Sequence, residues 1–365
     1  MTTRTKIDFG IHITPYFACM ARMEDGIPVI VKSESLRDTV PMYMAFNKKG
    51  NVFVSDAAYS IFKFDRIREF RNWNSSNSFL EFTWTPGTDQ NYYSLNTKKS
   101  YNSEELLAEV LKKLRSFITD DNIQSVVITV PAKFDIRQKD ATLRAAKLAG
   151  FKYTELLQEP IAASLAYGLD SKNKNGYWIV FNFNTSTFDA SLVKIDNGVM
   201  IVIDTDGNNY LGGKNLDLAI VDEIIIPYLQ ENYSINSILE DNTKKQILRE
   251  DLKYYAEEAK IKLSFNEVHN ILSDSGDIPG EDDEGEEFEL DITIDKEMFK
   301  SVAAPIFQKA IDTSQEVLKR NNLPGEQLGY IDISWRTDTF PHFTEIADGT
   351  DPGSGYKYRS YDCSC

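Results

Sequence analysis

Glu257, Lys260 and Ser264 are three polar residues whose spacing would place them on one face of a single helix. A carboxylate, an ammonium group and a hydroxyl on one face could bind a polar ligand. The same stripe could also be the solvated side of a surface helix, which is the commoner meaning of a charged run. Spacing alone therefore leaves both interpretations open.

Two other patterns could contact phosphate. Gly212 and Gly213 follow an expected strand and precede an expected helix, where backbone N–H groups can face an anion, although this pattern alone is a weak signal. His12 could also contact a phosphate, but a lone histidine in a loop is more often a surface residue. His269 and His342 show no metal-ligand spacing. The chemistry therefore depends on the elements that position these residues.

The composition indicates more than one folding unit. The chain has 365 residues, of which 42% are hydrophobic and 12% aromatic, and this exceeds what one core usually organises. Two domains or two lobes are therefore expected. A net charge of −16 and a pI near 4.8 argue against nucleic acid or an anionic membrane as a partner, because the field of the protein would repel phosphates.

The cysteines and the N-terminus indicate a location. Cys19, Cys363 and Cys365 show no CxxC or Cys/His spacing, which is typical of a reduced protein rather than of a disulfide framework or a zinc site. The first residues include no apolar signal segment, and no window reaches the length of a membrane span. We therefore expect a soluble, cytoplasmic protein.

Alternation of apolar and polar residues predicts two similar sheet regions. Residues 6–23 alternate and are followed by the turn Glu24-Asp25-Gly26 and an apolar run at 27–31, which predicts an opening β-hairpin. Residues 177–204 repeat this pattern, with turns at 182–186 and 196–198. Two similar sheet starts indicate an internal duplication of lobes.

Helical spacing of apolar residues predicts the remaining elements. Helices are expected at residues 103–117, 137–149, 160–167, 216–228 and 244–263, and a buried strand at 122–130. The acidic, glycine-containing segment 274–287 is interpreted as a solvated loop between strands rather than as a docking site.

Two long segments then indicate a family. ITVPAKFDIRQKDATLRAAKLAGF at residues 128–151 and LLQEPIAASLAYGL at 156–169 resemble the nucleotide-binding domain of the seventy-kilodalton heat-shock chaperones of the DnaK type. Shorter similar segments are IDFG at 7–10, VSDAA at 54–58, STFDASLVKI at 186–195, YLGGKNLD at 210–217 and AEEAKIKLS at 256–264. They follow the family's order from residue 1 to about 330, so chance similarity is excluded.

This resemblance implies an α/β fold of the actin and hexokinase type. Such a fold has two duplicated lobes, each with a central mixed five-stranded sheet, and it binds ATP and Mg²⁺ in the cleft between the lobes. Lobe I would span residues 1–168, with a core at 1–35 and 105–168 and a small subdomain at about 36–104. Lobe II would span 169–330, with a core at about 175–217 and 296–330 and a small subdomain at about 218–295.

Two glycine-containing turns of such a site let backbone N–H groups approach the phosphates, which a Cβ would obstruct. The resemblance begins the first turn, normally Gly-Thr-Thr, at Gly10 and extends it to Thr14, and Pro15 removes a donor. It places the second turn at residues 184–187, where Asn-Thr-Ser replaces three glycines before Thr187. Both turns are therefore expected to hold phosphate poorly.

The resemblance also implies acidic and catalytic residues. Asp8, two residues before the expected turn glycine, Glu159 and Asp189 would organise Mg²⁺ through water and the attacking water molecule, with Thr187 as a further catalytic residue. The family's aspartate ahead of the second turn is Asn182 here. Part of the acidic cage is thus expected to survive.

The adenosine would be held in the second lobe. The resemblance assigns nucleotide contacts to Gly10, Thr14, Gly212, Gly213, Glu257, Lys260 and Ser264. Among them, Glu257 would bind the ribose, the Lys260 stem would cover the base and Ser264 would supply a hydroxyl. The implied cofactors are ATP or ADP with Mg²⁺. The implied partners are an adenine nucleotide and a co-chaperone or nucleotide-exchange protein, for a monomeric chain.

Two functions stay open at this stage. Thr83 stands where the family has a lysine that offsets charge during γ-phosphoryl transfer, and one such loss costs about 10²- to 10³-fold in rate. The chain is therefore either a chaperone-family ATP-binding domain with slow or lost hydrolysis, or a non-hydrolysing scaffold or interaction module. Sugar or acetate kinase chemistry is disfavoured because the matching segments are chaperone-like.

The resemblance stops at residue 331, and residues 331–365 show no helical or strand period. The family has a buried strand ending in Val-Gly-Gly there. Permissible codons for residues 331–343, read one base later, encode Leu-Ile-Leu-Val-Gly-Gly, so we hypothesise a one-base frameshift that the coding DNA would reveal. The strand that closes the adenine pocket would then be missing, leaving an unpaired sheet edge.

Overall fold

The computed structural model of the chain describes residues 7–62, 77–118, 124–166, 175–323, 328–335 and 358–362. These residues divide into two units, each with its own hydrophobic core. Unit 1 comprises 7–62, 77–118 and 124–162, and unit 2 comprises 163–166, 175–323, 328–335 and 358–362. The expected lobe boundary at 168/169 lies outside the described residues.

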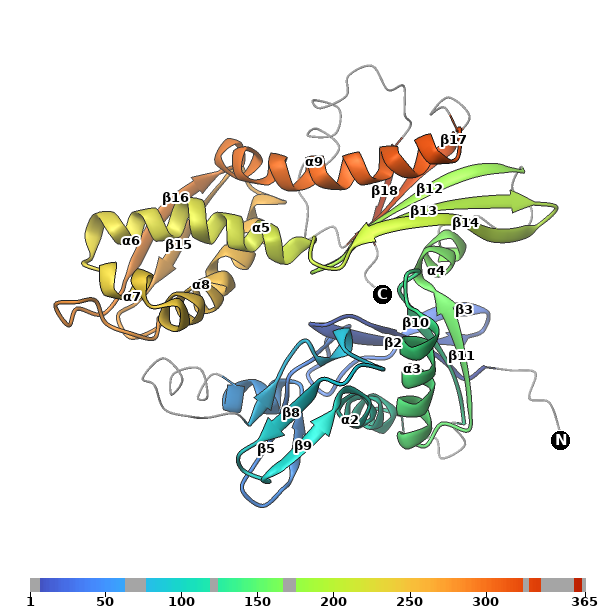
Figure 1. The fold of residues 1–365 in the computed structure, drawn as a ribbon, viewed down its shortest axis with the longest axis horizontal. Coiled ribbons are helices and arrows are strands. Elements are labelled where there is room, and N and C mark those ends of the chain that lie inside the picture. The colour runs from blue at the N-terminus through green and yellow to red at the C-terminus, as the bar shows by residue number, and fades with distance from the viewer. Residues whose placement is uncertain are drawn as a thin grey trace. The chain divides into compact units, whose positions relative to one another are not determined.

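Unit 1 is built on a mixed sheet with the strand order β11-β10-β1-β2-β3, and β4 pairs with β2 (Figure 1). Its strands are β1 (Phe9–Ile13), β2 (Phe17–Glu24), β3 (Ile27–Ile30), β4 (Val40–Pro41), β10 (Ser125–Val130) and β11 (Tyr153–Gln158). β1 pairs in parallel with β10 and β10 with β11, whereas β1, β2 and β3 pair antiparallel. The carboxyl ends of β1, β10 and β11 therefore lie at one edge of the sheet.

Two capped helices cover this sheet. α2 (Ser103–Ser116) and α3 (Ile136–Leu148) each begin with a capping box, in which the Asn102 and Asp135 side chains accept N–H bonds three residues on. The buried face of α2 carries leucine and valine, whereas that of α3 carries alanines, which lets the two helices pack closely. The helices predicted at 103–117 and 137–149 are thus confirmed.

The rest of unit 1 consists of short elements. They are β5 (Met44–Phe46), β6 (Val52–Val54), β7 (Ser78–Phe79), η1 (Phe82–Trp84), β8 (Asn91–Ser94) and β9 (Lys99–Asn102). β5 pairs with β6 and β7, and β8 pairs with β9. α4 (Glu159–Ala166) follows β11 directly and crosses from unit 1 into unit 2.

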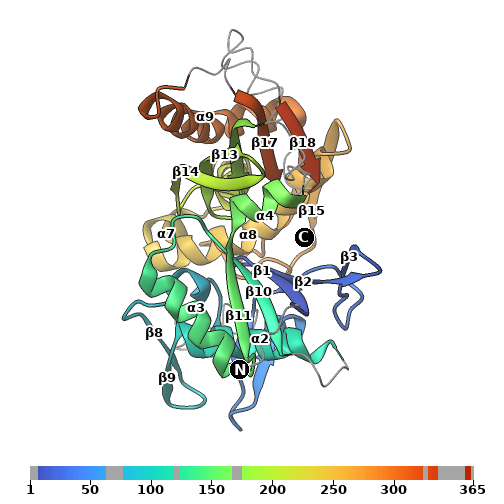
Figure 2. The same cartoon turned by 90° about the vertical axis from the view of Figure 1, so that its right-hand side faces the viewer.

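Unit 2 contains a second mixed sheet, which has five strands in the order β14-β13-β12-β17-β18, whereas the unit 1 sheet has a sixth strand in β4. Its strands are β12 (Gly176–Phe183), β13 (Phe188–Asp196), β14 (Val199–Asn208), β17 (Leu328–Trp335) and β18 (Tyr358–Asp362). β12, β13 and β14 pair antiparallel, whereas β12 and β17, and β17 and β18, pair in parallel. Figure 2 shows β17 and β18 side by side.

The expectation of an unpaired edge beside β12 is wrong. Residues 331–334 of β17 pair with residues 179–182 of β12. Strand pairing uses backbone N–H and C=O groups, so a short alternating run such as Ile331 to Ile333 suffices even where the longer tail has no period. Most residues of the tail after Trp335 lie outside the described part of the chain, so the frameshift stays a hypothesis.

Helices and a hairpin complete unit 2. They are α5 (Gly213–Ile220), η2 (Val221–Ile225), α6 (Ile226–Asn232), α7 (Asn236–Glu240), α8 (Asn242–Leu263), β15 (Val268–Ser273), β16 (Leu290–Asp295) and α9 (Lys296–Arg320). The helix predicted at 216–228 is present but starts earlier, and η2 is a π-helical turn within it. The acidic segment 274–287 connects β15 and β16, as predicted.

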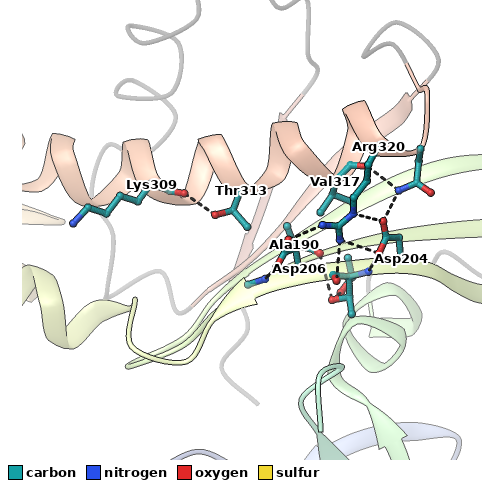
Figure 3. Close-up of polar contacts among 11 residues, drawn as sticks. Ala190, Asp204, Asp206, Lys309, Thr313, Val317 and Arg320 are labelled. Atoms are coloured by element: carbon teal, nitrogen blue, oxygen red, sulfur yellow. Dashed lines mark hydrogen bonds and ion pairs between the residues drawn. The ribbon is translucent and has the colours of Figure 1, made fainter. Parts of the chain in front are cut away.

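The C-terminal end of α9 is fixed to β14 by one arginine (Figure 3). The Arg320 Nε and Nη1 atoms each lie 2.6 Å from a carboxylate, of Asp204 and Asp206 respectively, and Nη2 also donates to the Thr205 carbonyl at 3.1 Å. The Arg320 guanidinium lowers the pKa of Asp204 below its ordinary value. These contacts of one guanidinium group hold the end of α9 in place across β13 and β14.

Two sequence expectations concern cysteine and membranes. The Cys19 side chain is buried on β2 and is disulfide-bonded, contrary to the expectation of reduced thiols, while Cys363 and Cys365 lie outside the described residues. Among the helices that the structure describes, none is both long enough and apolar enough to cross a bilayer.

Candidate functional site

The hairpin turn between β1 and β2 consists of Thr14, Pro15, Tyr16 and Phe17. The Thr14 N–H donates to the Phe17 carbonyl at 2.8 Å. The Thr14 hydroxyl oxygen accepts the N–H groups of Tyr16 at 3.3 Å and Phe17 at 3.0 Å. Pro15 has no N–H. Every backbone N–H group of this turn therefore already has an acceptor inside the turn.

The first turn was expected to begin at Gly10, but the structure places Gly10 inside a strand. Gly10 lies within β1 and pairs with Ala21 and Val127. A Cβ added to Gly10 would meet no atom within 4 Å, so no close approach of the backbone requires a glycine here. β1 continues past Gly10 to Ile13, and β2 begins at Phe17. The alternating residues 6–23 therefore form two strands joined by a turn rather than one strand.

Asp8 lies at the amino end of β1. Its carboxylate accepts the N–H groups of Gln124 at 3.0 Å and Ser125 at 3.1 Å, and the Ser125 hydroxyl at 2.9 Å. Ser125 is the first residue of β10. Glu159, by contrast, follows the carboxyl end of β11 and is buried. The structure therefore places these two candidate carboxylates at opposite edges of the unit 1 sheet.

His12 occupies the carboxyl edge of this sheet. Its Nδ1 lies 2.7 Å from the hydroxyl of Thr129 on β10, and its ring packs edge-on against Phe17. It is a half-buried strand residue and not a residue of a surface loop. Desolvation lowers the pKa of His12 to about 4, so the imidazole is neutral at pH 7.

A carboxylate contacts the first turn. The Tyr16 hydroxyl donates to a carboxylate oxygen of Glu81, two residues before Thr83. Thr83, which replaces the family's lysine, is buried in η1. Glu81 is separated from Tyr16 by 65 residues, and no local pattern points to it. A carboxylate thus contacts the first turn, and it would repel a phosphate bound there.

The second turn, from Asn184 to Thr187, packs against the start of α5. The Asn184 and Thr185 carbonyls accept the N–H groups of Gly213 at 2.9 Å and Lys214 at 2.5 Å. A Cβ on Gly212 would lie 2.5 Å from the Asn184 carbonyl oxygen and 2.6 Å from the Ser186 backbone. The helix N-terminus, a common phosphate site, is thus occupied by the turn itself.

The other candidates in unit 2 are buried on β12, β13 and the turn between them. Asn182 is on β12, Asp189 is on β13, and all three of Asn182, Thr187 and Asp189 have exposed fractions of 6% or less. The Thr187 carbonyl accepts the Asn184 N–H at 2.8 Å, which closes the turn. The structure thus brings Thr187, Gly212 and Gly213 together around one turn.

The three residues of α8 that were expected to contact adenosine differ in exposure and in hydrogen-bond partners. The Lys260 side chain is 3% exposed, and its Nζ lies 2.5 Å from Asp217 Oδ1 on α5. Burial raises the pKa of Asp217 above its ordinary value, although Lys260 opposes this shift. Glu257 is exposed, and the Ser264 hydroxyl donates to the Lys260 carbonyl at 3.4 Å. Lys260 therefore forms an internal ion pair and does not present its stem to a ligand.

The residues present do not fit a magnesium site in unit 1. Within the described ranges, no group of three or more His, Cys, Asp or Glu side chains is arranged to hold a metal ion. Asp8 binds backbone N–H groups at the edge opposite Glu159. No local sequence pattern points to Thr129 as the partner of His12 or to Asp217 as the partner of Lys260, although the YLGGKNLD segment includes Asp217.

Comparisons with known proteins agree with the resemblance. A family model described as Hsp70 protein matches residues 7–333. The chaperone protein dnaK1 of Synechococcus elongatus and the chaperone protein DnaK 3 of a Synechococcus species are each 31% identical over 336 residues. The alignments cover 88% of this chain and 50% of each relative. The chain thus spans about half the length of these relatives.

Proposed function

This chain belongs to the Hsp70 family, whose members typically bind ATP or ADP with Mg²⁺, and we propose that it is a nucleotide-binding domain that no longer hydrolyses ATP. The observation that supports this proposal most strongly is the hydrogen bonding within the first turn. Its three N–H groups are bound by the Thr14 hydroxyl and the Phe17 carbonyl. A phosphate can be held by such a turn only if these bonds break, which opposes binding.

Electrostatics supports the same conclusion. Hydrolysis needs preorganised positive charge beside the γ-phosphate, and each lost contributor lowers the rate by about 10²- to 10³-fold. Here a buried threonine, Thr83, replaces the lysine, and the carboxylate of Glu81 binds Tyr16 of the first turn. The rate of ATP hydrolysis should be compared with that of family members that retain this lysine. We therefore expect turnover at background.

We also propose that the two units are the duplicated lobes of an actin-like ATPase fold. In each sheet, one strand pairs antiparallel with the next strand in sequence and in parallel with a later one. Both sheets extend this order by a third antiparallel strand and a second parallel strand. This common order supports the duplication inferred from the sequence. The subdomain boundaries proposed above depend on it.

A non-hydrolysing scaffold or interaction module is the second candidate. The buried Lys260–Asp217 pair favours it, because this lysine cannot cover a base without leaving the interior. If a nucleotide binds, Glu257 and Ser264 remain proposed contacts of it, and Glu159 and Asp189 remain the proposed acidic residues beside its phosphates. A co-chaperone or nucleotide-exchange partner, a cytoplasmic location and a monomeric state are likewise proposals that rest on the family.

Calorimetric titration with AMP, ADP and ATP tests this function. Because the first turn offers no N–H group to a phosphate and the second turn binds the N–H groups of Gly213 and Lys214 at the start of α5, we expect the three dissociation constants to agree within about threefold, which is less than 1 kcal/mol. ATP binding about 100-fold tighter than AMP binding would contradict the proposal. No measurable heat with any of the three would favour the scaffold instead.

A further inference from the structure

The β1–β2 and β12–β13 turns correspond residue by residue. Each is closed by an N–H to carbonyl bond of 2.8 Å, from Thr14 to Phe17 in unit 1 and from Asn184 to Thr187 in unit 2. β1 ends one residue before Thr14, and β12 ends one residue before Asn184. In both sheets, the strand that enters the turn also pairs in parallel with a later strand.

This correspondence pairs His12 with Asn182. Each is the last residue but one of its strand. Asn182 is the residue that replaces the family's aspartate ahead of the second turn. Asp8 is four positions earlier on the chain than His12, which in an extended strand is about 13 Å. It binds residues 124 and 125 at the opposite edge of the sheet.

Ligands of open α/β sheets bind at the carboxyl ends of the parallel strands. His12, Thr129 and Glu159 lie at these ends in unit 1, and Asp8 does not. The Thr129 hydroxyl and the Phe17 ring fix the position of the imidazole. The sheet geometry therefore places His12 at the edge where a ligand would bind, whereas the IDFG match had pointed to Asp8.

We infer that His12, and not Asp8, stands at the nucleotide edge of unit 1, and that nucleotide binding by this chain is independent of Mg²⁺. The inference rests on the proposed function. Mg²⁺ binds hard oxygen atoms and binds anionic ones most strongly, so an imidazole nitrogen is a poor ligand and a neutral amide oxygen attracts the ion less than a carboxylate does. The positions ahead of both turns carry such uncharged groups, in His12 and Asn182.

Calorimetry in Mg²⁺ and in EDTA tests this inference, with ADP as the ligand. We expect the dissociation constant of the unmodified chain to change less than about twofold between the two conditions. His12→Asp places a carboxylate at the edge and should make binding about tenfold tighter with Mg²⁺ than with EDTA. His12→Asn is the matched control, because it can still bond to Thr129 but adds no charge.

Asp8→Asn represents the competing assignment. If the unmodified chain binds ADP at least about tenfold tighter with Mg²⁺ and Asp8→Asn abolishes this difference, the inference is overturned. If the unmodified chain binds no ADP at all, the proposed nucleotide binding fails. The placement of His12 is then decided by the His12→Asp variant alone. A gain of Mg²⁺-dependent ADP binding supports it, and no gain overturns it.

Discussion

Replacing Lys260 by methionine is expected to lower the free energy of unfolding of unit 2 by about 3–5 kcal/mol, because it leaves Asp217 buried without its cation. The two side chains are 3% and 2% exposed, so solvent cannot compensate. Urea-dependent hydrogen exchange of α5 and α8 peptides, read by mass spectrometry, would measure this loss within unit 2 alone.

The pH dependence of this variant follows from the pKa of Asp217. Burial already raises this pKa, and without Lys260 it rises further. An aspartate with a raised pKa in the folded state stabilises that state below its unfolded pKa of about 3.9 and loses this contribution as pH rises. Both proteins should therefore lose stability in parallel above about pH 4, and the defect of Lys260→Met should grow only above about pH 6, where Asp217 of the unmodified chain ionises in the folded state beside Lys260.

Two controls make this result specific. Lys262→Met changes an exposed lysine on the same helix and should cost less than about 0.5 kcal/mol. Combining Lys260→Met with Asp217→Asn removes both charges and should recover much of the loss. A cost below about 1 kcal/mol for Lys260→Met alone would show that the ion pair does not form.

Gly212→Ala has the second large expected effect. The added Cβ would lie within 2.6 Å of backbone atoms of Asn184 and Ser186, and backbone cannot yield as a flexible side chain can. We expect a loss of about 3 kcal/mol and faster hydrogen exchange of residues 184, 213 and 214, whose N–H bonds at this turn would open.

Gly176→Ala is the matched control for this variant. Gly176 lies on β12 of the same unit, and a Cβ there would meet no atom within 4 Å. It should leave the exchange of residues 184, 213 and 214 unchanged. Equal stability of Gly212→Ala and Gly176→Ala would mean that the second turn does not pack against α5.

Much of the fold could be predicted from the sequence, because long periodic segments determine element type. The α2 and α8 patterns gave helices with nearly the observed bounds, and residues 177–204 gave three strands. The missed turn at 14–17 contains neither glycine nor asparagine and is made by the Thr14 side chain. β17 was missed because its pairing depends on the backbone of β12.

The candidate site was harder to predict, because its contacts join distant residues. The sequence IDFG at 7–10 matches a family motif, yet β1 continues past it to Ile13. The motif therefore does not lie at the end of the strand, where the match had placed it. The partners of His12, Tyr16 and Lys260 are 117, 65 and 43 residues away. Spacing on one helix cannot reveal that one of its polar residues is buried against another helix.

Phosphate release under single-turnover conditions, with this chain in excess over ATP and Mg²⁺ present, tests the central claim most directly. We predict release at the rate of a protein-free solution, since every N–H group of the first turn already has an acceptor and Thr83 stands in place of the family's lysine. Faster release that disappears in Glu159→Gln would contradict it, because that variant separates turnover by this chain from that of a contaminating enzyme.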